Sequence, residues 1–435
     1  MDQISELPDE VIVDILSRLT VREAAKTSVL SRRWEHLWKF STSLNFDEMD
    51  RLSNIKTLNK RPSALDPDRD WYINCVNKAI DSHQIPWAEE LRVCFDLDKR
   101  CSDHIDKWVT SALGKRVKRL ELDLRRMSVL DMALKRSERY ILSNLGRFED
   151  CSFESLTCLQ LNTVEVTGDM LHYFLCNCPL LERLSVQKSQ SLIKLKIPAN
   201  AATSLTLRYL EIRGCHNLEE IDIVAATNLI SFKYHGSKID FHWNHMLPTE
   251  ASLGAEFGRD LLEAHVEGSS YFSQVQKLTW DYQSFFIYER KTVPQFPKLK
   301  QLDWNFRSDS FMDLDHVSKL LKACPFLSKI TLKFTADLRM SEKLVVVPRC
   351  PLECLEEVEM VGFKGLPAEV VFAMFLVENA KSLKKMTIDT CPPFYKGTPV
   401  EFSDSDCHYR QAPRKDAELL IENISSKSRA QVVVL

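Results

Sequence analysis

The residues with the spacing of metal ligands form three short pairs. They are Cys176/Cys178, Cys350/Cys354 and His242/His245. A structural zinc site needs four ligands, and neither cysteine pair is followed by a second pair at a suitable distance. We interpret the first pair as core thiols at a helix end and the second as flanking a proline turn. For the second pair the alternative is a zinc site. The two histidines are expected to lie in an exposed loop, and the alternative for them is a metal held by both on one helical turn.

Motifs for nucleotide, acyl-transfer and metalloprotease chemistry are absent from the chain. No G-x-x-x-x-G-K-[ST], G-x-G-x-x-G, G-x-S-x-G or H-E-x-x-H occurs, and only 11 glycines are available for phosphate-binding loops. No nucleophile is paired with a base at a recognisable spacing. The sequence therefore predicts no catalytic residue, no bound metal and no cofactor, and it favours a protein that acts by binding.

Composition limits the partners and the compartment. The 61 acidic residues nearly balance the 58 basic ones, which argues against nucleic acid or a membrane surface as a partner. The 13 cysteines are odd in number and scattered, as expected in a reducing compartment. No signal peptide and no membrane-spanning apolar run is present. We expect a soluble protein of the cytoplasm, the nucleus or both. A basic cluster at residues 115–119 is interpreted as a solvated strand face, with a nuclear signal or an acidic partner as the alternative.

The first element expected to position a binding surface is a group of three helices at the N-terminus. Residues 8–10 suit a first helical turn, because proline needs no N–H partner there and the helix dipole favours acidic side chains. Thr20 and Glu23 have the spacing of a capping box, which predicts a second helix, and Ser31 is expected to cap a third. Three helices this short cannot bury all of their large apolar side chains among themselves, so they need a partner surface.

The order and spacing of these residues resemble the F-box family over residues 4–47. Only Ala24-Ala25, where many members have leucine, departs from the pattern. The resemblance implies a module that binds the Skp-type adaptor of a cullin-RING ubiquitin ligase. The residues expected to form or support the adaptor-binding surface are Leu7, Pro8, Ile12, Ile15, Leu16, Leu19, Val29, Leu30, Ser31, Trp34, Leu37 and Trp38.

A second pattern, apolar-x-x-apolar-x-apolar, recurs along the rest of the chain. Copies begin at Ala88, Val117, Leu156, Leu181, Leu192, Leu207, Leu218, Leu229, Val275, Leu299, Leu327, Leu355 and Leu383. The last steps (299 to 327, 327 to 355 and 355 to 383) are equal, and each has room for a strand and a return helix. Between 192 and 229 the steps become too short for a helix, so those units are expected to return by loops.

Helical patterns at residues 105–112, 170–175, 317–321 and 370–375 fill several of the gaps between copies. The array resembles an irregular leucine-rich repeat solenoid of the F-box type, with an ordinary α/β sheet domain as the alternative. The stretch that starts at Cys350, with a later helix and a closing apolar strand at residues 431–435, resembles the FBD domain of plant F-box proteins.

The expected fold is therefore α/β: an N-terminal three-helix F-box, then an irregular leucine-rich repeat solenoid that ends in an FBD-type unit. The predicted boundaries are 1–48 for the F-box, 49–86 for a polar linker with a short helix, 87–349 for the repeat array and 350–435 for the FBD domain.

The resemblance implies a substrate-recognition adaptor of an SCF-type (cullin-RING) E3 ubiquitin ligase, which needs no catalytic residue of its own. The alternatives are a repeat scaffold that acts independently of ubiquitin and an enzyme with a small-molecule pocket in the repeats. In each copy the apolar residues point inward and the intervening residues point outward. The unknown protein substrate is therefore expected on the concave face, at Glu121, Gln160, Ser185, Glu211, Asp303, Thr331, Glu359 and Thr387.

Overall fold

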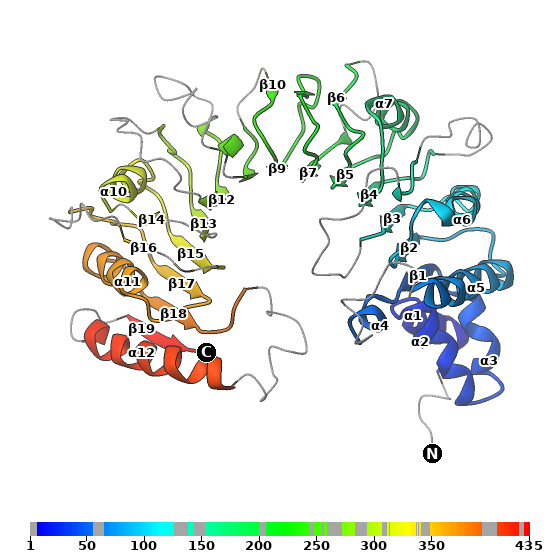
Figure 1. The fold of residues 1–435 in the computed structure, drawn as a ribbon, viewed down its shortest axis with the longest axis horizontal. Coiled ribbons are helices and arrows are strands. Elements are labelled where there is room, and N and C mark those ends of the chain that lie inside the picture. The colour runs from blue at the N-terminus through cyan, green and yellow to red at the C-terminus, as the bar shows by residue number, and fades with distance from the viewer. Residues whose placement is uncertain are drawn as a thin grey trace. The chain divides into compact units, whose positions relative to one another are not determined.

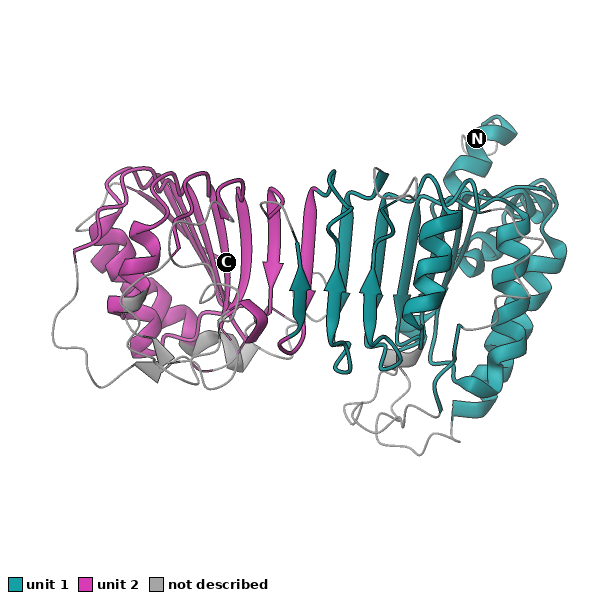
Figure 2. Cartoon of the chain, turned by 90° about the horizontal axis from the view of Figure 1, so that it is seen from above, with its two compact units in different colours: residues 1–229, 239–243 teal, residues 230–238, 244–435 magenta. Residues whose placement is uncertain are grey.

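The computed structural model describes most of the chain and divides it into two compact units. The described ranges are 7–54, 65–125, 138–142, 153–199, 206–243, 247–254, 256–258, 272–282, 294–306, 311–312, 314–335, 337, 339–340, 349–393, 407–425 and 430–435. Unit 1 comprises residues 1–229 and 239–243, and unit 2 comprises residues 230–238 and 244–435 (Figure 2). Each unit is described by itself below.

Unit 1 begins with the short helices expected from the sequence. They are α1 (Asp9–Leu16), α2 (Val21–Lys26), a 3-10 turn at Thr27–Val29, α3 (Trp34–Leu37) and a second 3-10 turn at Trp38–Phe40. Thr20 caps α2: its hydroxyl accepts the Glu23 N–H at 3.2 Å, and the Glu23 carboxylate accepts the Thr20 N–H at 3.0 Å. The predicted capping box is therefore confirmed.

The main sheet of unit 1 consists of parallel strands in the order β1-β2-β3-β4-β5-β7 (Figure 1). Their bounds are β1 (Ser43–Asp47), β2 (Glu90–Cys94), β3 (Arg119–Asp123), β4 (Cys158–Asn162), β5 (Arg183–Gln187) and β7 (Tyr209–Arg213). Leucines face one another across the register, from Leu91 through Leu120 and Leu159 to Leu184 and Leu210, and all five are buried. The apolar pattern of the repeats is thus the core of the sheet.

The copies at Leu192 and Leu218 lie in a second sheet, which the sequence analysis did not foresee. This sheet is parallel, in the order β10-β8-β6, with β6 (Lys194–Lys196), β8 (Glu220–Asp222) and β10 (Asp240–His242). Successive copies of the apolar pattern in this part of the chain therefore belong alternately to the two sheets. The expected loop returns are strands here, because the apolar pattern says which residues point inward and not which sheet they join.

The segment 49–86, expected to be a linker with a short helix, contains two helices. They are α4 (Met49–Asn54) and α5 (Asp66–Ser82), which is 17 residues long. Tyr72 of α5 is buried and stacks on Phe95 with ring centroids 4.3 Å apart. Arg69, also buried, pairs with Asp96 at 2.6 Å. Two further helices, α6 (Ser102–Gly114) and α7 (Gly168–Asn177), pack with the repeats of unit 1 as expected. Residues 66–82 are therefore part of the folded core of unit 1.

Unit 2 has a parallel sheet in the order β9-β11-β12-β13-β15-β17-β18-β19. Its strands are β9 (Ser231–His235), β11 (Glu250–Leu253), β12 (Lys277–Tyr282), β13 (Gln301–Phe306), β15 (Lys329–Phe334), β17 (Glu357–Val361), β18 (Lys385–Asp389) and β19 (Gln431–Val434). The short strands β14 (Phe311–Met312) and β16 (Arg339–Met340) pair separately. The equal steps predicted between Leu299 and Leu383 are confirmed, since Leu302, Ile330, Val358 and Met386 occupy one row of the register.

Helices α10 (Leu314–Lys322), α11 (Pro367–Asn379) and α12 (Cys407–Ser425) run along one face of the unit 2 strands (Figure 1). Of the apolar face expected in α11, Phe375 is buried and Val370, Val371 and Met374 are half-buried, while Phe372 and Leu376, outside that face, are fully buried. The helix was correctly predicted, but its buried face was not, because α11 is apolar on nearly all sides. No helix in the described ranges combines the length and hydrophobicity that a membrane crossing requires.

Candidate functional site

The predicted adaptor-binding residues divide into a buried group and an exposed group. Ile12, Leu16, Ala24, Trp34 and Leu37 form a compact core beneath α1, α2 and α3. Leu7, Leu19 and Trp38 are half-buried and pack against this core. The buried group therefore supports the helices, and substituting it would unfold them before it tested any contact with a partner.

The exposed group is apolar and sits on the same helices. Val29 is 88% exposed, Leu30 is 60% exposed and Ile15 is 39% exposed. Pro8 is exposed as well, and Val11, one helical turn before Ile15, is 42% exposed. Several large aliphatic side chains left in water on one small helical module are typical of a protein-binding surface. We call Ile15, Val29 and Leu30 the apolar patch.

Polar contacts hold these helices in place. The Arg33 guanidinium pairs with Asp9 at 2.7 Å, which ties α3 to the first turn of α1. Ser31 is half-buried, and its hydroxyl accepts the Trp34 N–H at 3.4 Å, as expected of a helix-capping serine. The Ser17 hydroxyl accepts the Thr42 N–H at 2.9 Å and thereby fixes the chain that enters β1. The apolar patch is thus presented on a fixed scaffold.

The predicted substrate-binding residues all lie on the outward side of the strands, opposite the buried apolar rows. In unit 2 Asp303, Thr331 and Glu359 are register partners on β13, β15 and β17. They line a hollow of about 380 Å³ together with Gln301, Lys329, Lys333, Val361 and Pro393. Thr387 continues the row beside Glu359. The structure brings these predicted residues together, although Asp303 and Thr331 are only 8% and 5% exposed.

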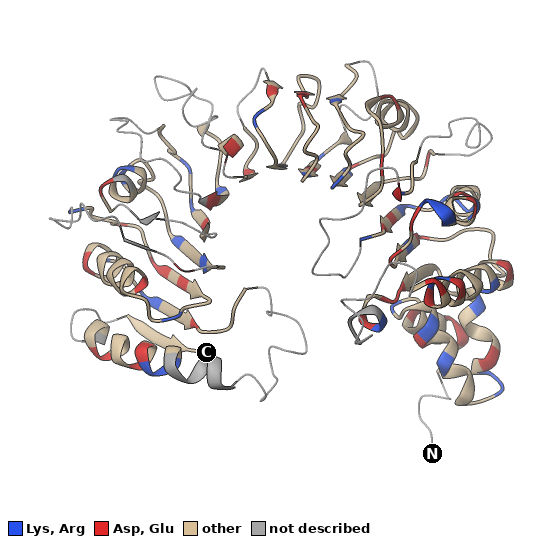
Figure 3. Ribbon diagram, in the orientation of Figure 1, with Lys and Arg blue, Asp and Glu red and all other residues tan. Residues whose placement is uncertain are grey.

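In unit 1 the predicted row consists of Glu121, Gln160, Ser185 and Glu211, again adjacent in register. The Ser185 hydroxyl donates to the Glu211 carboxylate at 3.3 Å, and Ser185 is buried. Glu121 pairs with Arg92 at 3.1 Å, while its own burial raises its pKa. Basic and acidic residues both occur on the strands of each unit (Figure 3). These rows can therefore recognise polar groups of either charge.

A serine, a histidine and an aspartate of unit 2, which the sequence analysis missed, have the distances of a catalytic triad. His235 Nε2 lies 2.8 Å from Ser252 Oγ, and His235 Nδ1 lies 3.0 Å from Asp281 Oδ2. The three come from β9, β11 and β12, so no local motif could have revealed them. Asp281 also accepts a hydrogen bond from Asn305 at 2.8 Å.

An acyl-transfer site also needs donors for the oxyanion. Ser252 lies in the middle of β11, whose backbone is paired in register on both sides with β9 and β12. The neighbouring N–H groups are therefore engaged in the sheet. We interpret Ser252, His235 and Asp281 as a buried polar network that ties three strands together.

Sulfur and oxygen atoms that suit a metal come together at a place the sequence analysis also missed. Cys94 on β2 and Glu121 and Asp123 on β3 offer ligand atoms within 4.8 Å of one another. The Arg92 guanidinium already pairs with Glu121 at 3.1 Å and with Asp47 at 3.1 Å, and burial raises the pKa of the Cys94 thiol. Glu121 is thus already paired with a cation, and Asp123 pairs with Arg125 at 3.1 Å, so we interpret the cluster as an ion-pair network.

The metal-ligand pairs considered from the sequence have ordinary surroundings in the described residues. Cys178 is buried at the end of α7, as expected, but Cys176 is exposed rather than a core thiol and lies 3.5 Å from His172 Nε2. The buried Cys350 thiol donates to the Ser318 carbonyl at 3.5 Å, and Cys354 is half-buried. His242 lies in a strand, β10, rather than on the helical turn considered above, and His245 lies outside the described residues.

The basic cluster at residues 115–119 is largely neutralised. Lys118 pairs with Glu89 and Arg119 with Glu90, each at 3.1 Å. Lys115 Nζ donates to the Ile85 carbonyl at 2.8 Å. Of these basic residues only Arg119 lies in a strand; Lys115, Arg116 and Lys118 lie in the connection between α6 and β3, so the expected strand face is mainly a turn.

The fold and these surfaces define a class of protein: an F-box module that exposes an apolar patch, followed by leucine-rich repeats with a polar strand face. Residues 4–44 match the F-box domain family, and residues 88–426 match the family described as "At1g61320/AtMIF1, LRR domain". The chain belongs to the plant F-box/FBD/leucine-rich repeat family.

Two relatives from Arabidopsis thaliana illustrate the match. The F-box/FBD/LRR-repeat protein At5g22660 is 24% identical, over 89% of this chain and 89% of its own length. The putative FBD-associated F-box protein At5g22720 is 25% identical, over 96% of this chain and 93% of its own length. These likenesses support an F-box adaptor-like protein, and members of the F-box/leucine-rich repeat family are typically non-catalytic adaptors. F-box domains in general bind Skp-type adaptors.

Proposed function

We propose that this chain is the substrate-recognition subunit of an SCF-type ubiquitin ligase, in which the F-box binds the Skp-type adaptor and the repeats bind a protein substrate. The observation that carries the proposal is the apolar patch: Val29 and Leu30 are largely exposed on helices whose core is otherwise closed. Burying such side chains against a partner gives about 25 cal/mol for each Å² of apolar surface removed from water.

The strand face supplies the second binding surface that a recognition subunit needs. In unit 2 the hollow lined by Asp303, Thr331 and Glu359 offers carboxylate, hydroxyl and ammonium groups within about 380 Å³. Such a lining suits a polar segment of a substrate better than an apolar one, because each buried polar group has to find a partner. The chain would hold the substrate near a ubiquitin-charged enzyme and raise its effective concentration there.

Purification of the full-length chain from plant cells, with and without a proteasome inhibitor, tests the proposal. The wild-type chain should capture the Skp-type adaptor and a set of proteins that accumulate under the inhibitor. Val29→Asp/Leu30→Asp should lose the adaptor and still capture those proteins, because the strand face is untouched. The double variant should also lengthen their half-lives, since it binds them without delivering them.

The rival is a repeat scaffold that acts independently of ubiquitin. It predicts that the captured partners keep the same half-life in cells with the wild-type chain, the double variant or the inhibitor. That result, with the adaptor absent from the wild-type purification, would overturn the proposal. We also propose that the chain acts in the cytoplasm, the nucleus or both, and the localisation of a fluorescent fusion can be used to test this.

A further inference from the structure

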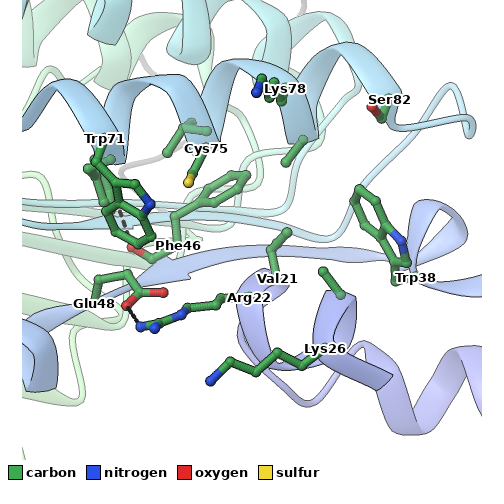
Figure 4. A pocket seen from close by; sticks show the side chains of 14 residues that line it. Val21, Arg22, Lys26, Trp38, Phe46, Glu48, Trp71, Cys75, Lys78 and Ser82 are labelled. Atoms are coloured by element: carbon green, nitrogen blue, oxygen red, sulfur yellow. Dashed lines mark hydrogen bonds and ion pairs between the residues drawn. The ribbon is translucent and has the colours of Figure 1, made fainter. Parts of the chain in front are cut away.

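A pocket unrelated to the apolar patch opens in unit 1 between α2, β1 and α5 (Figure 4). Its volume is about 510 Å³, within the range of small-molecule sites. The apolar part of its wall comes from these three elements and from the 3-10 turn at Trp38–Phe40: Val21, Ala25, Trp38, Phe46, Trp71 and Val76. The pocket therefore exists only because α5 packs over the F-box helices and the first strand.

Charged groups surround this apolar interior unevenly. Glu48 is the one carboxylate among the lining residues, and Arg22 neutralises it with an ion pair of 2.7 Å. The Arg22 guanidinium also lies 5.5 Å from the ring centre of Trp71. Lys26 on α2 and Lys78 on α5 are exposed, and neither has an ion-pair partner among the described residues. The lining thus carries an excess of two positive charges.

We propose that this pocket binds a small amphipathic anion, with an aromatic or aliphatic body between Trp38 and Trp71 and an acidic group at the rim, where Lys26 lies on one side and Lys78 on the other (Figure 4). Flat aromatic walls and few charged groups are typical of sites for organic ligands of this size. The two ammonium groups select for negative charge, because an acid is the partner that they lack. The proposal is independent of adaptor binding, since the apolar patch contributes none of the lining residues.

Cys75 provides a direct reporter, because it lines the pocket and its thiol is exposed. In Figure 4 its sulfur points from α5 toward Phe46 on β1. The full-length chain is treated with N-ethylmaleimide at alkaline pH, with and without 8-anilinonaphthalene-1-sulfonate as the anionic probe. The uncharged N-phenyl-1-naphthylamine, which has the same apolar body, is the matched probe. Labelling is read by mass spectrometry of the peptides.

The sulfonate is expected to slow labelling of Cys75 at least about tenfold, while Cys176, an exposed thiol on α7, serves as the internal control and should label at an unchanged rate. Lys26→Glu/Lys78→Glu should weaken binding of the sulfonate about tenfold, which is about 1.4 kcal/mol, and leave binding of the neutral probe within about twofold. If the variant misfolds, Lys26→Gln/Lys78→Gln, which removes charge without adding repulsion, replaces it.

Two results would overturn the proposal. Equal labelling of Cys75 with and without the sulfonate would show that the pocket takes no such ligand. Equal protection by the sulfonate and by the neutral probe, with no response to the lysine variants, would show an apolar cleft that does not select an anion and fits an apolar side chain of a protein partner instead.

Discussion

The F-box helices and the repeat strands differ in how much of their apolar pattern residues they leave exposed to water. In the repeats the motif residues are completely buried: Leu302, Ile330 and Met386 lie in one buried row of the unit 2 sheet. In the F-box, Val29 and Leu30 belong to an equally strong family pattern and remain in water. The same residue types therefore stabilise a fold in one region and make a binding surface in the other. Which outcome applies depends on whether neighbouring elements of the chain cover the position.

The largest expected effect breaks the repeat side of this comparison. Ile330→Asp places a carboxylate in the fully buried row of β15, beside the apolar Leu302 and Val358, and should cost more than about 4 kcal/mol of unfolding free energy. Lys385→Asp changes an exposed position on β18 and should cost less than about 0.5 kcal/mol. Urea unfolding followed by circular dichroism measures both. Similar losses for the two variants would refute the assignment of inward and outward positions.

The second prediction concerns the join between the two regions. Arg69 of α5 is buried and pairs with the buried Asp96 at 2.6 Å, and a further pair to Asp98 has a distance of 3.5 Å. Arg69→Ala removes the guanidinium from the buried Asp96, while Asp98 keeps its pair with Arg100, and should cost about 3–5 kcal/mol. Lys107→Ala removes an exposed pair with Asp81 and is the control, with an expected cost under about 0.5 kcal/mol. A negligible cost for Arg69→Ala would mean that α5 is a linker after all.

A pH dependence sharpens the account of the C-terminal repeats. Glu369 on α11 is fully buried, and desolvation raises its pKa from 4.5 to about 7, although its carboxylate accepts the Lys364 N–H at 2.8 Å. Between these values the folded chain keeps a proton that the unfolded chain has lost. Stability should therefore fall as the pH rises from about 4.5 to about 7, by up to about 3 kcal/mol.

Glu369→Gln should flatten this fall, because the amide oxygen can still accept the backbone N–H groups and the side chain no longer titrates. Denaturant unfolding at several pH values measures the effect as a difference from the wild type. Glu378→Gln, an exposed change on the same helix, is the matched control. An identical pH profile for the wild type and Glu369→Gln would contradict the assignment.

The smallest effect is expected at the polar network of unit 2. Ser252→Ala removes one hydrogen bond to His235 and should cost about 1 kcal/mol. A fluorophosphonate should leave Ser252 of the wild type unmodified, because the sheet engages the nearby N–H groups. Covalent labelling of Ser252, detected by mass spectrometry, would show instead that this network is a nucleophilic site.

Much of the fold could be predicted from the sequence where local chemistry decides it. The Thr20–Glu23 capping box and the equally spaced rows of unit 2 follow from short-range spacing. Strand β1 could not be predicted in this way, because its single buried row, Leu44 and Phe46, has no preceding junction motif. Helix α5 was taken for a linker because it is polar; it is held in place partly by the buried Arg69, which only the fold can pair.

The sequence predicts which residues belong to the candidate surfaces, but it does not predict which of them are buried and which are exposed. Spacing identified Ile12 and Val29 as F-box positions alike, yet only packing shows that the first is buried and the second is exposed. Ser252, His235 and Asp281, like the wall of the pocket beside α5, assemble from separate strands and helices. Contacts of this kind depend on the register between elements, which the sequence pattern does not contain.

The central claim is that the exposed apolar patch of the F-box binds a Skp-type adaptor, and calorimetric titration of the purified adaptor into the full-length chain tests it most directly. Val29→Ser/Leu30→Ser should raise the Kd at least about tenfold while the unfolding free energy stays within about 0.5 kcal/mol of the wild type. Phe326→Ser, which removes a 59% exposed aromatic residue from unit 2, should leave the Kd unchanged. An unchanged Kd for the F-box double variant, or an equal loss for Phe326→Ser, would contradict the account.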